Sequence, residues 1–412
     1  MTSPSTLGIY VQVPFCQTKC TYCNFHTGPV SRELYDPFAA AVRREIEMIR
    51  QPAPPGVLSS ALHVLQPGPP QPAPGLPAES RTAWLDLPVS TVYVGGGTPS
   101  LLEPATLAQV MDSIRTRFSG DWQEATLEAD PETITLPKAQ AWRAAGFNRI
   151  SLGVQSFSDE ELRAAGRMHR RDDVFVAFRL LRAAGFANLS ADLIAGLPHQ
   201  TDSSWSDSLE QLLLLGPEHV SIYMMEIDEG SRLGREVLHG GERYSAGALP
   251  DDDSMVRFYE VACERLESAG YDHYEISNWG LPGHYSQHNL KYWQRAPYLG
   301  LGAGAHSFDG HSRWANEHRP DAYVAAIQQG RRPVEQYEVV SWQQALEEEL
   351  FLGLRLLDGI DLSALEGRYN LSLRERFAPL IANGLIAARG TRVRLAPGRI
   401  AVSNLVFTEL LA

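Results

Sequence analysis

The stretch Gly8-Ile-Tyr-Val-Gln-Val-Pro-Phe15 runs directly into Cys16-Gln-Thr-Lys-Cys20-Thr-Tyr-Cys23. An apolar, strand-like run thus ends in three cysteines spaced as Cys-x3-Cys-x2-Cys. A structural zinc site takes four ligands, and four cysteines normally hold a [4Fe-4S] cluster. Three closely spaced thiolates are one short of either set. The spacing therefore favours an iron–sulfur cluster in which one iron stays open to a small molecule.

Further apolar runs of strand length alternate with helix-like stretches. The strand-like runs are Ile9–Val13, Val89–Val94, Ala125–Ala129, Arg149–Val154, Leu189–Ile194 and Val220–Met225. The helix-like stretches are Arg32–Ile49, Ala105–Phe118, Pro137–Ala145, Val174–Ala184 and Ser204–Leu215. Ser158 and Glu161 fit a capping box for another short helix. The alternation predicts a parallel sheet covered by helices. The cysteines follow the first strand, at the carboxyl edge where such sheets place their chemistry.

The whole chain of 412 residues is long enough for two or three domains, or for one large barrel with a small appendage. Its formal net charge of −13 argues against broad binding to nucleic acid or anionic membranes. Four cysteines, three of them clustered, do not form a disulfide framework. We find neither a signal peptide nor an apolar run of the ~18 residues that span a bilayer, and expect a cytoplasmic protein.

Two regions depart from the alternating pattern. Gln51–Ala78 is rich in proline and lacks charged side chains, so we expect a surface loop over 51–80. A linker between two domains is the alternative. After Ser341, two helical stretches (Gln343–Leu356 and Leu373–Asn383) and a hairpin-like segment (Leu385–Val402) resemble a winged helix.

A glycine segment, Val94-Gly95-Gly96-Gly97-Thr98-Pro99, follows the second strand. Its backbone can approach a ligand, and turn amides can bind a carboxylate or phosphate. Together with the three cysteines, it resembles the radical S-adenosylmethionine superfamily. In that superfamily the amine and carboxylate of S-adenosylmethionine chelate the open iron, and an electron from the cluster cleaves the sulfonium to a deoxyadenosyl radical. A zinc knuckle completed by His26 is the alternative.

Further motifs tighten this resemblance. They are Tyr10 six residues before Cys16, Glu128 in Leu-Glu-Ala-Asp-Pro, Gln155 in Gly-Val-Gln-Ser-Phe, Arg167 in Gly-Arg-Met-His-Arg and Asp192 in Asp-Leu-Ile-Ala-Gly-Leu-Pro. In this order they resemble the oxygen-independent coproporphyrinogen III dehydrogenases and the related HemW family of haem chaperones. The resemblance implies a partial (β/α)6 barrel over residues 1–240, an extension over 241–340 and a winged-helix-like domain over 341–412.

The resemblance also implies roles for single residues. Cys16, Cys20 and Cys23 would hold the [4Fe-4S] cluster. Positions that contact the cluster-bound S-adenosylmethionine are matched by Tyr10, Gly96 and Glu128. Positions around a second S-adenosylmethionine are matched by Tyr22, Gly97, Thr98, Gln155, Arg167 and Asp192. Taken singly, each polar residue could instead make an ordinary hydrogen bond inside a barrel.

Three features separate the two related groups. The dehydrogenases carry a further cysteine two residues after the third, where this chain has Phe25. They also have a substantial segment before the Tyr–Cys strand, whereas nine residues precede Tyr10 here. The segment His288-Asn-Leu-Lys-Tyr-Trp293 matches the His-Asn-x-x-Tyr-Trp signature of HemW proteins. All three features resemble HemW.

The same segment suggests a haem site. Histidine is a normal axial ligand of haem iron, and aromatic side chains suit an apolar macrocycle. His288, Tyr292 and Trp293 would lie close together on a helix, with His306 as the second candidate ligand. The alternative is that His288 satisfies buried backbone groups. We expect His169 to belong to a solvated basic cluster and Cys263 to be a small core residue.

The expected function is that of a haem chaperone, which binds haem, the cluster and S-adenosylmethionine and passes haem to acceptor apoproteins. Acceptors would include respiratory haem proteins, which would bring the chaperone to membranes, and an electron donor would reduce the cluster. Radical cleavage would be vestigial or would gate the transfer, so whether the protein is an enzyme stays open. The main alternative is oxidative decarboxylation of coproporphyrinogen III. A radical enzyme acting on tRNA is disfavoured by the acidic composition.

Overall fold

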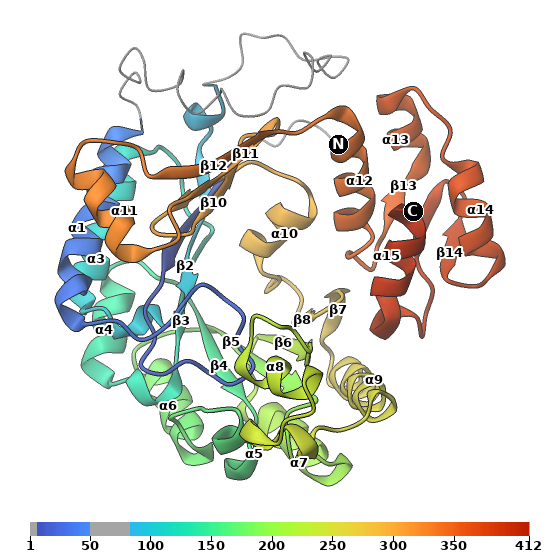
Figure 1. Ribbon diagram of the computed structural model, residues 1–412, viewed down its shortest axis with the longest axis horizontal. Coiled ribbons are helices and arrows are strands. Elements are labelled where there is room, and N and C mark those ends of the chain that lie inside the picture. The colour runs from blue at the N-terminus through green and yellow to red at the C-terminus, as the bar shows by residue number, and fades with distance from the viewer. Residues whose placement is uncertain (1–5, 50–82, 412) are drawn as a thin grey trace.

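The computed structural model describes residues 6–49 and 83–411 (Figure 1). The proline-rich stretch 51–80 lies outside these residues. Within the described part, twelve strands form one sheet in the order β12-β11-β10-β9-β1-β2-β3-β4-β5-β6-β8-β7. A separate sheet of three strands lies near the C-terminus.

Six parallel strands form the centre of the large sheet and pair in chain order. They are β1 (Leu7–Val13), β2 (Val89–Gly96), β3 (Glu124–Ala129), β4 (Arg149–Gln155), β5 (Asn188–Ala195) and β6 (His219–Met224). Each coincides with a predicted strand to within two residues at either end. The strands are buried along most of their length because helices cover the sheet.

The connecting helices also match the sequence pattern. They are α1 (Tyr35–Met48), α3 (Pro104–Arg117), α4 (Leu136–Ala144), α5 (Asp159–Ala164), α6 (Arg171–Ala183) and α7 (Asp202–Leu215). In α6 the buried residues Val174, Ala177, Phe178 and Leu181 recur at helical spacing and face the sheet. Ser158 caps α5 as predicted, since its side chain accepts from the Glu161 N–H.

The extension flanks both edges of the parallel strands. On one edge, β9 (Tyr298–Leu301) runs parallel to β1, and β10 (His306–Phe308), β11 (Ser312–Asn316) and β12 (Val334–Val339) continue in antiparallel pairs. On the other edge lie β8 (Asn278–Gly280) and β7 (Asp272–Glu275). The helices of this region are α8 (Arg232–Leu238), α9 (Asp252–Ser268), α10 (Gln287–Trp293) and α11 (Pro320–Gln328). Because β12 and β7 stay unpaired with each other, the sheet remains open, as expected for a partial barrel.

A buried carboxylate joins the first helix to the extension. Glu45 of α1 accepts hydrogen bonds from the Gly302 N–H at 2.9 Å, Asn316 Nδ2 at 2.7 Å and the Tyr323 hydroxyl at 2.6 Å. Burial raises the pKa of Glu45 to about 7 despite these donors. This carboxylate connects segments that lie more than 250 residues apart in the chain.

The C-terminal segment has a hydrophobic core of its own, built mainly from residues 346–410. Its elements are α12 (Trp342–Gly353), β13 (Ile360–Asp361), α13 (Leu362–Tyr369), α14 (Arg374–Ala382), β14 (Ile386–Arg389), β15 (Arg392–Leu395) and α15 (Ser403–Leu411). The predicted hairpin is present as β14 and β15. Figure 1 shows this segment beside α10 and β7. None of the described helices combines the length and the apolar character needed to cross a membrane.

Candidate functional site

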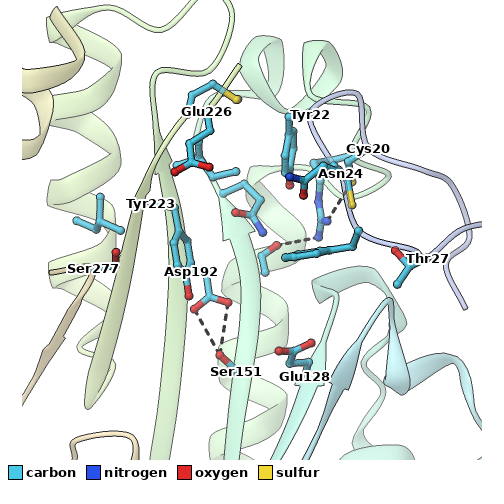
Figure 2. A pocket seen from close by; sticks show the side chains of 18 of the residues that line it. Cys20, Tyr22, Asn24, Thr27, Glu128, Ser151, Asp192, Tyr223, Glu226 and Ser277 are labelled. Atoms are coloured by element: carbon cyan, nitrogen blue, oxygen red, sulfur yellow. Dashed lines mark hydrogen bonds between the residues drawn. The ribbon is translucent and has the colours of Figure 1, made fainter. Parts of the chain in front are cut away.

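A cavity of about 570 Å³ opens at the carboxyl ends of the parallel strands. It is lined by all three clustered cysteines and by eight of the nine residues predicted to bind S-adenosylmethionine: Tyr22, Gly96, Gly97, Thr98, Glu128, Gln155, Arg167 and Asp192. Figure 2 shows Cys20, Tyr22 and Asn24 on one side of the cavity and Asp192, Tyr223 and Ser277 on the other. The parallel sheet therefore brings together residues that are up to 176 positions apart (Cys16 and Asp192).

The three cysteines lie on the loop that follows β1, and each is partly exposed and free of disulfide bonds. The loop closes where the Cys16 N–H donates to the Gly28 carbonyl at 3.0 Å and the Gly28 N–H donates to the Pro14 carbonyl at 3.1 Å. Burial raises the pKa of the Cys16 thiol to about 11. Binding of a metal ion to this sulfur would therefore displace a proton.

Gly97 packs directly against this loop. Its N–H donates to the Val13 carbonyl at 2.7 Å, and a Cβ at this position would collide with the Phe15 carbonyl and lie 2.9 Å from Cys16 Sγ. A side chain would therefore displace the cysteine loop. Glycine here keeps the space beside Cys16 open, which fits a loop that must hold a bulky inorganic group.

Glu128 binds the glycine segment from the neighbouring strand. The Gly96 N–H donates to Glu128 Oε2 at 2.9 Å, and the Tyr93 hydroxyl donates to Oε1 at 2.8 Å. Burial raises the pKa of Glu128 to about 7. Tyr10, the ninth predicted residue, lies outside the cavity lining and stacks on Tyr93 with ring centroids 5.9 Å apart. It therefore supports the site through Tyr93.

Arg167 forms a partly buried ion pair with Asp130 beside the cysteine loop. The same guanidinium donates to the Gly153 carbonyl at 2.9 Å and to Cys20 Sγ at 3.5 Å. Thr98 Oγ1 also donates to Asp130, at 3.0 Å. Asp130 thus organises two predicted residues, although the sequence prediction omitted it. The sequence could have pointed to Asp130, because it stands in Leu-Glu-Ala-Asp-Pro at the end of a predicted strand.

Two more predicted residues lie across the cavity. Gln155 has a φ of 65°, a left-handed backbone conformation that is uncommon outside glycine. Asp192 accepts from the Ser151 hydroxyl at 3.4 Å, and burial raises its pKa to about 6. The cavity therefore holds buried carboxylates that change charge near neutral pH.

His288 is buried inside the barrel and has both ring nitrogens engaged. Nδ1 lies 2.9 Å from Thr91 Oγ1, and Nε2 lies 2.9 Å from the Tyr292 hydroxyl, one turn along α10. His288 is 1% exposed, and burial lowers the pKa of its ring to about 3. The neutral ring therefore bridges two hydroxyl groups in this structure.

The expectation that Trp293 joins His288 and Tyr292 was wrong. The Trp293 ring lies under the guanidinium of Arg355, 4.3 Å from its centroid, and so faces the C-terminal segment. Five residues along a helix correspond to about 500° of rotation, so Trp293 projects away from His288. His306, the second candidate ligand, is exposed at the start of β10.

His169 is also not part of a solvated basic cluster, contrary to expectation. The residue is 2% exposed, and its Nε2 lies 3.0 Å from the Val154 carbonyl. The ring is buried where it can donate to the carbonyl at the end of β4. The arginines next to His169 in the sequence suggested an exposed position instead. Cys263 lies on α9 and packs partly buried against the main core, as predicted.

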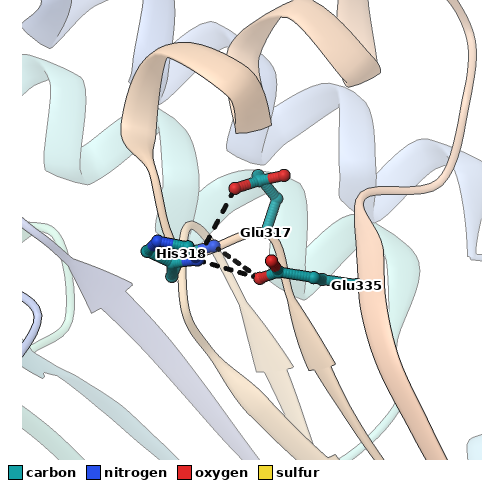
Figure 3. A group of neighbouring side chains, drawn as sticks. All are labelled: Glu317, His318 and Glu335. Atoms are coloured by element: carbon teal, nitrogen blue, oxygen red, sulfur yellow. Dashed lines mark hydrogen bonds and ion pairs between the residues drawn. The ribbon is translucent and has the colours of Figure 1, made fainter.

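An exposed polar group lies outside the cavity, next to the end of the cysteine loop (Figure 3). His318 Nδ1 lies 2.9 Å from Glu335 Oε2 and 3.7 Å from Glu317 Oε1. The hydrogen bond to Glu335 raises the pKa of His318. The ring of His26 lies 5.6 Å from that of His318, so the residue that could complete a zinc knuckle packs beside this ion pair.

Known families and proteins resemble the chain over most of its length. The Radical SAM superfamily matches residues 79–212, and the HemN C-terminal domain matches residues 340–397. "Heme chaperone HemW" of Mycobacterium tuberculosis is 34% identical over 98% of this chain and 94% of that protein. The protein of the same name from Bacillus subtilis is 32% identical over 98% of both chains. The chain belongs to the HemW family.

A solved structure supports the fold of this HemW family member. The radical SAM enzyme coproporphyrinogen III oxidase (HemN) from Escherichia coli superposes with a TM-score of 0.77 over 99% of this chain and 89% of that chain, at 20% identity. The fold is thus that of a radical SAM protein with a partial barrel. At this identity the likeness describes architecture alone.

In this member of the HemW family, the far wall of the cavity comes from the C-terminal segment. Arg355, Ile400, Ala401, Ser403 and Asn404 line it. Arg355 lies 3.8 Å from the buried Glu275 of β7, which anchors the segment to the sheet. The sequence prediction missed these residues, because no local pattern records how two separate cores pack together.

Proposed function

We propose that this protein is a haem chaperone that binds a [4Fe-4S] cluster, S-adenosylmethionine and haem and transfers the haem to acceptor proteins. Near full-length similarity to proteins named heme chaperone HemW supports the function. The structural observation that carries it is a loop with three cysteines at the mouth of the cavity, while the fourth cysteine of the chain, Cys263, lies on α9.

The residues present fit such a cluster. Three partly exposed thiols share one short loop, and the glycine at position 97 leaves room beside Cys16. Arg167 brings a positive charge to Cys20, which offsets the negative charge of the thiolates. When bound, the cluster would supply an electron to the sulfonium of S-adenosylmethionine.

The protein's own residues would hold the cofactor. The Glu128 carboxylate, which the Gly96 N–H orients, keeps free lone pairs that would accept from the amino group of the cofactor. In a second S-adenosylmethionine molecule, the carboxylate would meet Arg167, which Asp130 holds in place, and hydroxyl groups would donate to Asp192. Gln155, Tyr22, Gly97 and Thr98 line the same space, which supports a second cofactor molecule there.

For haem, we propose His288 as the axial ligand and the motif around α10 as the binding region. Iron that binds at Nε2 would then have to displace the Tyr292 hydroxyl. His306 is exposed and serves as the alternative ligand. Phe25, which is 65% exposed on the cysteine loop, offers an apolar surface to a macrocycle.

The proposed setting follows from the same chemistry. Free thiols that bind iron need a reducing compartment, which supports a cytoplasmic location. An electron donor would reduce the cluster, and haem-containing respiratory proteins are the proposed acceptors, through which the chaperone would reach a membrane. Acceptor identity can be tested by following haem transfer to purified apoproteins.

The competing function is oxidative decarboxylation of coproporphyrinogen III. The structural likeness to HemN favours it only at the level of fold. Reconstituted protein should be given coproporphyrinogen III and S-adenosylmethionine under anaerobic, reducing conditions. The chaperone proposal predicts no protoporphyrinogen IX and saturable binding in a haem titration of the same preparation. Formation of protoporphyrinogen IX would overturn it.

A further inference from the structure

A pair of titratable side chains lies at the wall of the cavity and takes no part in the cofactor and haem binding proposed above. Glu132 belongs to a 3-10 turn, η5 (Pro131–Thr133), that follows β3, and it lines the cavity. His169 follows α5, and its Nδ1 lies 3.6 Å from Glu132 Oε2. Both atoms are inaccessible to solvent and lack a hydrogen-bond partner among the described residues.

The tautomer of His169 follows from its other nitrogen. Nε2 lies 3.0 Å from the Val154 carbonyl, which can only accept, so Nε2 carries the hydrogen. In a neutral ring Nδ1 then carries a lone pair, and its nearest charged neighbour is Oε2 of Glu132, 3.6 Å away. Two acceptors facing each other in a buried place repel unless a proton lies between them. The geometry therefore requires one proton on the pair.

The charges around the pair decide where this proton resides. Burial and the neighbouring Asp130 raise the pKa of Glu132 to about 7, while Arg167 opposes this shift. Burial and Arg167 lower the pKa of His169 to about 4. Asp173, from the first turn of α6, adds negative charge to both. The proton therefore belongs mainly to Glu132, which faces the Nδ1 lone pair of His169 at 3.6 Å, just beyond hydrogen-bond distance.

We propose that Glu132 and His169 share a single proton, and that loss of this proton adds one negative charge to the cavity wall that faces a bound S-adenosyl cofactor. The second part rests on the proposed function. With the proton, Glu132 adds no charge to the wall and faces the ring of His169. Without it, the wall carries an anion that attracts the sulfonium cation of S-adenosylmethionine. The neutral thioether S-adenosylhomocysteine would not gain from this anion.

The shared proton can be tested by infrared spectroscopy of the reconstituted protein across a pH titration. Other buried carboxyls, including Glu128, titrate in the same range, so the wild-type spectrum must be compared with Glu132→Gln. The difference should contain a protonated carboxyl band that disappears near neutral pH. His169→Phe should shift this band, because the carboxyl loses the ring nitrogen that faces it. An absent band, or one unchanged in His169→Phe, would overturn the shared proton.

The effect on the cofactor can be tested by calorimetry with S-adenosylmethionine and S-adenosylhomocysteine at about pH 6 and about pH 8. The preference of the wild type for S-adenosylmethionine should rise several-fold at the higher pH, and Glu132→Gln should reduce that rise. Glu160→Gln is the matched control, because this carboxylate lies exposed on α5. An equal rise in Glu132→Gln would overturn the role of the pair. If wild type bound neither compound, the proposed function would fail while the spectra still tested the proton.

Discussion

The carboxylate side chains in the cavity accept hydrogen bonds, and burial raises their pKa values. Glu128 shows this most clearly, because it accepts from the Gly96 N–H and the Tyr93 hydroxyl at the same time. One carboxylate thereby holds the glycine segment in place beside the cysteine loop. The prediction of Glu128 from its motif identified the residue, and the structure adds the two donors.

Substitution Glu128→Gln should weaken S-adenosylmethionine binding by roughly tenfold. An amide offers one acceptor oxygen, so either the Gly96 N–H or the Tyr93 hydroxyl loses its partner. Equilibrium binding to the reconstituted protein measures this change, with the exposed-site variant Glu160→Gln as the control. Unchanged affinity in Glu128→Gln would show that this carboxylate does not contact or organise the cofactor.

The bonded state of His288 gives a test of the haem ligand. Tyr292→Phe removes the hydroxyl that occupies Nε2, so haem affinity should rise by roughly fivefold if this nitrogen binds the iron. His288→Ala should weaken haem binding and alter the Soret band. His306→Ala should leave both unchanged. Loss of haem in His306→Ala, with no effect of the other two substitutions, would assign the ligand to His306.

At the scale of elements, strands and helices were predictable because burial imposes simple periods on the sequence. Apolar runs marked β1–β6, and Ser158 marked the start of α5. Long-range side-chain bonds were not predictable in this way. His288 meets Thr91 across 197 residues, and Glu45 meets Gly302 across 257. No local pattern encodes such partners.

The contact between the glycine segment and the cysteine loop predicts the effect of a single methyl group. Gly97→Ala would press the new Cβ against the Phe15 carbonyl and Cys16, so the protein should lose about 1–3 kcal/mol of stability and bind less iron. Gly367→Ala is the matched control. Gly367 lies in α13 with open space around it, and alanine there should stabilise by up to about 1 kcal/mol.

Denaturant unfolding and iron analysis of both variants measure these effects. Normal iron content and stability in Gly97→Ala would show that the loop and the glycine segment are not packed as described.

The buried Glu45 links α1 to the extension and predicts a dependence of stability on pH. Its pKa rises to about 7 in the folded chain, so the folded state holds this proton more tightly than the unfolded state. The resulting contribution is present below the ordinary carboxyl pKa and is lost as pH rises through about 7. It amounts to on the order of 3 kcal/mol at most.

Glu45→Gln should abolish this part of the pH dependence, because the amide does not titrate. Chemical denaturation of wild type and variant at several pH values measures the difference. Parallel curves across this range would contradict a buried, protonated Glu45.

At the scale of the whole molecule, the parallel sheet brings the predicted site residues to one cavity, and the C-terminal segment forms the far wall of this cavity. The alternation of strands and helices predicted a parallel sheet with chemistry at its carboxyl edge, and the family resemblance predicted most of the residues in the cavity. The packing of Arg355 against Trp293 and Glu275 could not, because it depends on how two hydrophobic cores meet.

The central claim is that three cysteines hold an iron–sulfur cluster with one open corner, which receives S-adenosylmethionine. Mössbauer spectroscopy of the anaerobically reconstituted protein, with and without S-adenosylmethionine, tests it most directly. The account predicts a [4Fe-4S] cluster in which one iron site changes its parameters when the cofactor is added. A preparation without such a cluster, or a cluster whose four irons are unaffected by the cofactor, would contradict it.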